Sequence, residues 1–272
     1  MIGQFIFPTC EAAGLRVAAY LRNTPRGEMM SSAPDLAVDL QVFEHGTLVA
    51  HEPTFGVIPL GGVLEVSERT CAALASSGRE RLVVARCSTP DGSETYFPQE
   101  HHLSYENVRT GVFDSLLYDQ LPIVKPGRRA SPIILLAPKA WVGRDLNSFV
   151  AFANVGAPGE SSMQSEPLVI SVLRTTGELL TTQVIEEPVN SALLFDVHAA
   201  LGDDPLVAGA PTLVNVVARG GASKYAIMTF VVNHATGNFA LEHSLSPHYY
   251  VTDGLARVRS EALSTLIPAS AS

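Results

Sequence analysis

The chain has 272 residues, of which 46% are hydrophobic and 17% are charged, and its formal net charge is −9. Such a composition is typical of a folded protein with a sizeable core, since disordered chains are poorer in apolar residues and richer in charge. An acidic chain is poorly suited to phosphate backbones, so we expect no nucleic-acid partner. No apolar run approaches the roughly 20 residues of a membrane helix, so we expect no membrane contact.

The N-terminal residues and the cysteines predict a cytoplasmic protein. Residues 1–10 lack the basic start and long apolar core of a signal peptide. The three cysteines, Cys10, Cys71 and Cys87, are an odd and sparse set without a Cys-x-x-Cys motif. They are therefore expected to be free, buried thiols in a reducing compartment.

In chain order, the predicted strands fall into two matching sets about 130 residues apart. The matching segments are 17–23 with 149–154, 36–43 with 168–173, 83–86 with 216–219, and 107–111 with 233–237. Residues 83–86 and 216–219 are both Val-Val-Ala-Arg, and both final segments begin with Asn and end with Thr-Gly. Because the matches keep one order, with offsets of 126 to 133 residues, they predict an internal duplication.

The periodicity within these segments is that of strands. Leu36, Val38, Leu40 and Val42 alternate with smaller or polar residues, whereas residues 168–173 are nearly all apolar, as in a strand buried on both faces. The Thr-Gly pairs at 110–111 and 236–237 are typical of hairpin turns. About seven strands in each set predict an all-β protein of two tandem immunoglobulin- or fibronectin-like β-sandwich domains. The Cys…Trp…Cys core of true immunoglobulin domains is absent.

We place the first sandwich at residues 1–123, a connection at 124–145, the second sandwich at 146–251 and a C-terminal tail at 252–272. The connection is rich in proline and contains the only tryptophan, Trp141. Its apolar run 133–137 could pack as a strand. The pattern leaves open whether residues 1–13 pair within their own half or with another chain.

Standard catalytic motifs are absent, so candidate site residues come from local clusters of polar side chains. The candidates are Glu100, His102, Arg109, His234, His243, His248 and Tyr249. Glu100 and His102 would share one face of a strand, and Glu242, His243 and His248 lie near the end of the other set. His102, His243 and His248 are the candidate ligands of a divalent metal such as zinc or iron, although ordinary surface histidines are the simpler interpretation. Arg109 and His234 lie in the two matched turns, and Tyr249 would be a proton donor beside His248.

Three functions follow from this pattern. We favour a non-catalytic protein that binds a protein or small molecule in the cleft between the domains or at their loop tips. The first alternative is an enzyme with a His/carboxylate site, with or without a metal, at the domain interface. The second is a structural component of a homo-oligomer joined through sheet edges.

Overall fold

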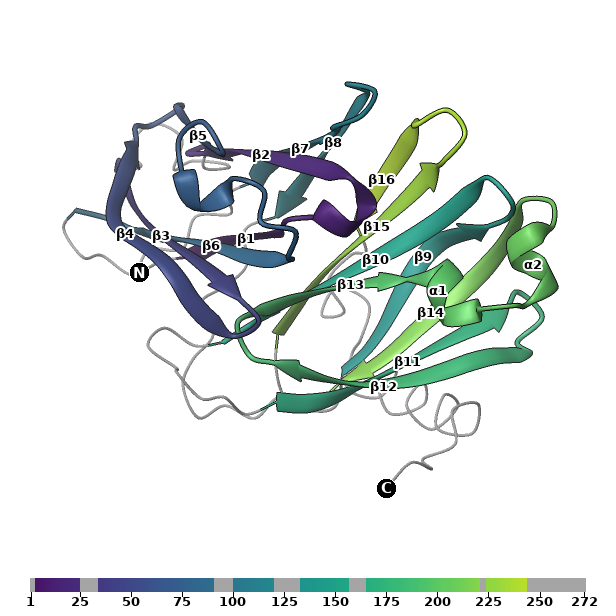
Figure 1. The fold of residues 1–272 in the computed structure, drawn as a ribbon. Coiled ribbons are helices and arrows are strands. Elements are labelled where there is room, and N and C mark those ends of the chain that lie inside the picture. The colour runs from purple at the N-terminus through teal and green to yellow at the C-terminus, as the bar shows by residue number, and fades with distance from the viewer. Residues whose placement is uncertain are drawn as a thin grey trace.

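The computed structural model describes residues 3–24, 34–90, 100–119, 133–156, 165–220 and 224–243. Over these ranges, sixteen strands form four antiparallel sheets of four strands each (Figure 1). The all-β class predicted from the sequence is confirmed. No helix within the same ranges is long and apolar enough to cross a membrane.

The first half of the chain forms sheets A and B. Its strands are β1 (Gly3–Pro8), β2 (Leu15–Arg22), β3 (Leu36–Glu44), β4 (Thr47–Ile58), β5 (Val63–Ser67), β6 (Arg81–Ser88), β7 (Glu100–Asn107) and β8 (Phe113–Asp119). Sheet A has the order β1-β6-β3-β4, and sheet B has the order β5-β2-β7-β8. Inward residues of both sheets, among them Phe5, Leu40, Leu21 and Leu103, belong to one buried apolar core. The N-terminal strand β1 pairs with β6, so residues 3–8 pair within their own half.

The second half forms sheets C and D. Its elements are β9 (Ile133–Val142), β10 (Leu146–Val155), β11 (Ser165–Arg174), β12 (Leu179–Pro188), β13 (Ser191–Asp196), α1 (Val197–Leu201), α2 (Pro205–Ala208), β14 (Thr212–Gly220), β15 (Lys224–Asn233) and β16 (Phe239–His243). Sheet C has the order β12-β11-β14-β9, and sheet D has the order β13-β10-β15-β16. Strand β9 lies in the stretch predicted as the connection, where Pro132 and Pro138 indicate a loop, and it pairs with β14.

The two halves have the same strand order. Replacing β1–β8 by β9–β16 in sheets A and B gives the orders of sheets C and D. Among the described residues each half therefore has eight strands, one more than the roughly seven expected from the sequence. In an immunoglobulin domain the first strand pairs with the second, whereas here β1 pairs with β6 and β9 pairs with β14.

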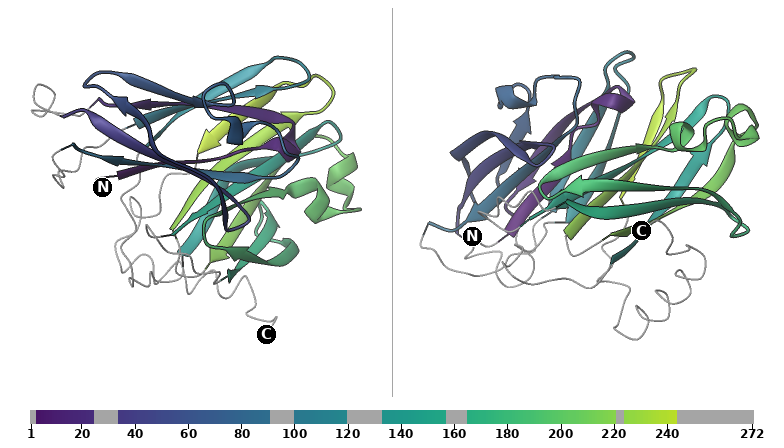
Figure 2. Two further views of the ribbon diagram at one scale, coloured as in Figure 1. Left: turned by 60° about the vertical axis from the view of Figure 1, so that its left-hand side comes forward. Right: turned by 60° about the horizontal axis from the view of Figure 1, so that its bottom comes forward.

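Sheet D is buried on both of its faces. One face contributes Val150, Phe152 and Ile227 to the core of the second half. The opposite face contributes Phe149, Ala151, Ala153, Met228, Phe230 and Val232 to the core of the first half. Strands β8 and β16 contact each other, and the Leu241 N–H donates to Asp114 Oδ2 at 2.9 Å. Figures 1 and 2 show β15 and β16 beside the strands of the first half.

Tyr105 of β7 marks where sheet D meets the first half. The Tyr105 hydroxyl donates to the Pro8 carbonyl at 2.8 Å and lies 3.8 Å from Met228 Sδ. The rings of Tyr105 and Phe230 meet edge to face, with centroids 4.9 Å apart. Sheet D of the second half therefore covers the side of the first half's core that lies between the edge strands β1 and β8.

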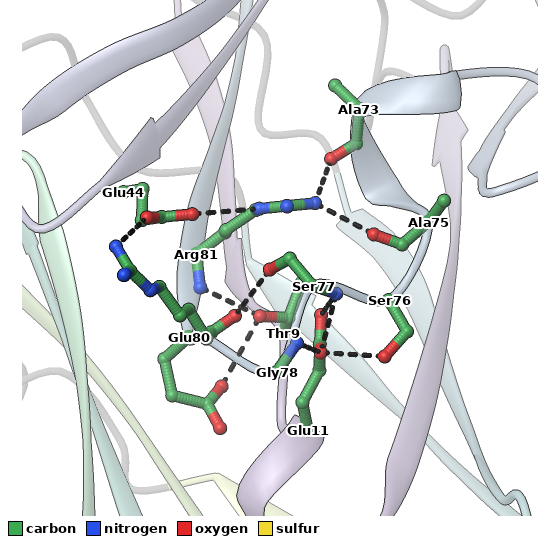
Figure 3. Close-up of polar contacts among 11 residues, drawn as sticks. Thr9, Glu11, Glu44, Ala73, Ala75, Ser76, Ser77, Gly78, Glu80 and Arg81 are labelled. Atoms are coloured by element: carbon green, nitrogen blue, oxygen red, sulfur yellow. Dashed lines mark hydrogen bonds and ion pairs between the residues drawn. The ribbon is translucent and has the colours of Figure 1, made fainter.

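A polar cluster fixes the N-terminal segment to the loop before β6 (Figure 3). The Glu11 carboxylate accepts hydrogen bonds from Ser76 Oγ at 2.9 Å and from the Gly78 N–H at 2.7 Å. Arg81 donates to the Ala75 carbonyl at 2.9 Å. Burial raises the pKa of Glu80 to about 7, although the Ala12 N–H donates to its carboxylate at 2.8 Å.

Candidate functional site

The structure places the candidate residues predicted from the sequence at separate positions on the sheets. Glu100 and His102 lie in β7, and His243 ends β16 opposite Met228. The His102 ring is half-buried and its centroid lies 6.0 Å from that of Tyr20. His248 and Tyr249 lie outside the described residues. Within the described ranges, no three His, Cys, Asp or Glu side chains are grouped so that they could hold a metal ion.

Arg109 and His234 are brought together, because the two matched turns touch. The Arg109 guanidinium donates to the His234 carbonyl at 3.3 Å. Asn107 Nδ2 donates to the Gly237 carbonyl at 3.1 Å. Gly237 has φ +76°, and a Cβ atom at this position would clash with Thr110 Cγ2. The two loop tips therefore form a contact between the halves.

A cavity of about 520 Å³ opens elsewhere, within the second half. It is lined by Trp141, Leu146, Pro211, Thr229, Val231, Ala240, Leu241 and Glu242. Its volume lies in the range of roughly 300–1,000 Å³ that is usual for small-molecule sites. Trp141 belongs to β9 and Ala240–Glu242 to β16, the edge strands of sheets C and D, so the cavity lies at the open edge of the second half.

The loops and the strand pairing explain why this edge is open. Inward positions alternate along β15, so Ile227 fills the core while Thr229 and Val231, nearer the β15–β16 turn, reach the cavity. Gly143 and Leu146 form an isolated bridge in the turn between β9 and β10. A Cβ atom at Gly143 would lie 3.0 Å from Pro211 Cα. This close approach fixes Pro211 at one side of the cavity.

The equivalent place in the first half is filled. Val231 lies two residues before Asn233, as Tyr105 lies two residues before Asn107 in the matched turn. In the first half, the large Tyr105 side chain contacts Met228 and Phe230 of sheet D. In the second half, the smaller Val231 lines the cavity.

Thr229 is the buried polar side chain of the cavity. The residue is 1% exposed, and its Oγ1 atom has no hydrogen-bond partner among the described residues. A buried hydroxyl left without a partner costs about 1–3 kcal/mol. Leu103 occupies the equivalent position in the first half, so the fold does not require a hydroxyl there.

Trp141 and Glu242 complete the chemistry of the lining. Trp141 keeps 36% of its surface exposed, and its backbone is fixed because its N–H donates to Ser148 Oγ at 2.6 Å. The Ser148 hydroxyl in turn donates to the Trp141 carbonyl at 2.9 Å. Glu242 carries the single formal charge among the eight lining residues. The lining is therefore mostly apolar, with Thr229 and Glu242 as its two polar residues.

Of the residues that line the cavity, the sequence analysis singled out Glu242, because it lies beside a candidate histidine. It did not identify the other lining residues as candidates. Glu242 belongs to the polar group near the end of the second set, beside His243. Trp141 was assigned to the connection, and Thr229 and Val231 are ordinary strand residues in sequence. The signal for Trp141 was its being the only tryptophan, two residues before Gly143.

Comparisons with known proteins supply no function. No protein-family model matches the chain, and no curated protein matches its sequence. Among solved structures, one of manganese lipoxygenase of Gaeumannomyces graminis with part of zonadhesin of Komagataella pastoris is 12% identical, covers 89% of this chain and 85% of that chain, and has a TM-score of 0.22. A serine-rich repeat protein of Streptococcus agalactiae is 7% identical over 92% of this chain and 85% of that chain, with a TM-score of 0.21. At these TM-scores, neither likeness carries an argument about function.

Proposed function

We propose that this chain is a non-catalytic binding protein that holds a small, largely apolar molecule in the cavity between β9, β10, β15 and β16. The observation that carries the proposal is the cavity itself, together with its lining residue Thr229, whose buried hydroxyl has no hydrogen-bond partner among the described residues. Unsatisfied buried polar groups in native proteins call for an explanation, and a ligand that supplies the partner is one. The cavity volume and the partial exposure of the lining residue Trp141 support the same conclusion.

Binding without catalysis fits the residues of the cavity. General acid–base and nucleophilic chemistry use imidazole, thiol or activated hydroxyl groups beside a base. The lining contains neither histidine nor cysteine, and its carboxylate belongs to Glu242. The cavity therefore replaces the cleft between the halves and the loop tips as the binding site that we propose.

We also propose that the chain arose by duplication of one β-sandwich unit and functions in the cytoplasm. Identical strand order and the repeated Asn-x-x-Thr-Gly turns support the duplication. In both turns the asparagine Oδ1 accepts hydrogen bonds from the N–H groups two and three residues later. Three free, buried cysteines support a reducing compartment.

The emission of Trp141 tests the binding function directly, because it is the only tryptophan of the chain and lines the cavity. Titration with 1-octanol is expected to shift the emission to shorter wavelength and to saturate. Ala240→Phe, which adds a ring at the exposed strand residue that lines the cavity, is expected to abolish the shift.

Val184→Phe is the matched control, because Val184 is 47% exposed on edge strand β12 and does not line the cavity. This variant should titrate like the wild type. Emission that does not respond to octanol or to other apolar probes would overturn the proposal, as would equal binding by Ala240→Phe.

A further inference from the structure

We infer that the cavity selects a compact aromatic ring that carries a hydroxyl group, that is, a small phenol. The inference deepens the binding function proposed above and rests on it. The observation that carries it is a difference between equivalent positions of the two halves. Where the first half has the fully buried side chain of Tyr105, the second half has the cavity and its lining residue Val231.

The strand register shows that Tyr105 and Val231 occupy equivalent positions. In sheet B, Tyr105 of β7 lies opposite Asp114 of β8. In sheet D, Val231 of β15 lies opposite Ala240 of β16. At both positions the residue of the second half is the smaller one, and both Val231 and Ala240 line the cavity. The cavity therefore lies at positions that carry larger side chains in the first half, the largest of which is a phenol.

The surroundings of Tyr105 show how the first half holds such a ring. The ring meets that of Phe230 edge to face, with centroids 4.9 Å apart. Its hydroxyl donates to the Pro8 carbonyl at 2.8 Å. Buried tyrosines usually need both kinds of contact, because the ring is apolar and the hydroxyl requires a hydrogen-bond partner. A phenol in the second half would therefore need an aromatic neighbour and one polar group.

Two lining residues of the cavity are suited to these two roles. Trp141 is the aromatic residue among the eight that line it, and aromatic pairs gain more than the burial of their area alone. Thr229 also lines the cavity, and its Oγ1 atom has no hydrogen-bond partner among the described residues. A threonine hydroxyl can either donate to a phenol oxygen or accept from it. An aliphatic alcohol would use the hydroxyl alone, and a plain hydrocarbon ring would use the tryptophan alone.

Three ligands of similar size test this selection. p-Cresol, which has the structure of the tyrosine side chain, is compared with toluene and with 4-methylcyclohexanol. Trp141 emission is followed with excitation at the red edge of indole absorption, where phenols do not absorb. p-Cresol is expected to bind about fivefold more tightly than toluene, the ratio that one hydrogen bond gives. It should bind about threefold more tightly than 4-methylcyclohexanol, the ratio that an aromatic pair gives. Because toluene is less soluble in water than p-cresol, hydrophobicity alone would reverse the first order.

Two variants assign the effect to its residues. Val231→Tyr gives the second half the residue of the first, so its own ring should take the place of the ligand and abolish p-cresol binding. Val184→Tyr is the matched control, because Val184 is 47% exposed on β12 and does not line the cavity, and it should titrate like the wild type. Thr229→Val should remove the preference for p-cresol over toluene and leave the affinity for toluene unchanged.

The outcomes separate the inference from the function beneath it. If toluene or 4-methylcyclohexanol binds as tightly as p-cresol, or if Val231→Tyr binds p-cresol like the wild type, the phenol selection is wrong. The binding function then stands on the 1-octanol titration. If neither octanol nor any of the three ring ligands shifts the emission, the binding function itself is overturned. Should Val231→Tyr fail to fold, the order of the three ligands on the wild type and on Thr229→Val decides.

Discussion

Sheets B and D occupy equivalent places in the two halves and have the same strand order, yet their outward faces differ. Half-buried and mostly polar residues cover the outward face of sheet B on β2 and β7; they are Ala18, Tyr20, Arg22, His102, Ser104 and Glu106. The equivalent face of sheet D carries Phe149, Ala151, Ala153, Met228, Phe230 and Val232, all in the core cluster of the first half. One backbone arrangement thus serves as an outer surface in one half and as a central layer in the other.

The open edges of the halves show the reverse difference. Sheet D covers the edge between β1 and β8, where Tyr105 contacts Met228 and Phe230. Among the described residues, no equivalent sheet covers the edge between β9 and β16, where the cavity lies. With the same strand order, the second half therefore has a cavity at the edge where the first half has a covering layer.

Exchanging the residues of the two outward faces tests this comparison most strongly. Phe230→Ser gives sheet D the residue that sheet B has at Ser104, and it is expected to lower the free energy of unfolding by about 4 kcal/mol, since a fully buried ring is lost. Ser104→Phe makes the opposite change on a half-buried face and should cost no more than about 1 kcal/mol. Urea unfolding followed by circular dichroism measures both. Equal costs would show that sheet D is not the central layer.

A second asymmetry concerns charge at the ends of equivalent strands. Glu187, beside the end of β12, is 3% exposed and hydrogen-bonded to Ser191, and burial raises its pKa to about 7. The residue at the corresponding place in the first half, just before the end of β4, is Val57, which is exposed and uncharged. Asn23 and Asn154 donate to the strand-end carbonyls of Ile58 and Pro188, which makes these two strand ends equivalent.

The raised pKa of Glu187 makes stability depend on pH. Between the ordinary pKa of 4.5 and the folded value of about 7, the folded state binds more protons than the unfolded state, so stability falls as pH rises through this window. The loss amounts to about 3 kcal/mol at pH 8. Glu187→Gln should therefore be more stable than the wild type at pH 8 and close to it at pH 5. Urea unfolding of both proteins at the two pH values checks this, and a difference independent of pH would contradict it.

The matched turns offer a control within one molecule. Gly111 and Gly237 have φ values of +70° and +76°, so alanine is strained at both. At Gly111 the nearest atom to an added Cβ is 4.0 Å away, whereas at Gly237 the Cβ meets Thr110 and the Arg109 guanidinium. Gly111→Ala should cost about 1 kcal/mol, and Gly237→Ala about 2–3 kcal/mol because the contact between the halves is also disturbed. Thermal unfolding of both variants measures the difference, and equal losses would show that the turns do not press together in solution.

These turns also show how far the sequence alone can lead. Local hydrogen bonds form both turns, because each asparagine bonds to N–H groups two and three residues later, so the sequence predicts them correctly. Their mutual contact depends on how the halves are placed, which no local pattern encodes. The residues of β9 were assigned to the connection because of its prolines, and the apolar run 133–137 was left open as a strand. The sequence could not predict the cavity for the same two reasons. Its lining joins Trp141 of β9 to residues about 90 to 100 positions later, and their proximity depends on the tertiary fold.

Thr229 gives the smallest expected effect and connects stability to function. The equivalent residue of the first half is Leu103, which is fully buried in the core. Replacing the Thr229 hydroxyl by a methyl group in Thr229→Val removes a buried polar atom that has no described partner, so the free energy of unfolding should rise by about 1 kcal/mol. The same variant should bind 1-octanol more weakly than the wild type in the Trp141 titration. A gain in stability together with a loss of binding would identify the hydroxyl as a group kept for a ligand, because functional sites commonly retain features that reduce stability. A destabilised variant would instead mean that the hydroxyl has a structural partner, and the binding proposal would then rest on the cavity and Trp141 alone.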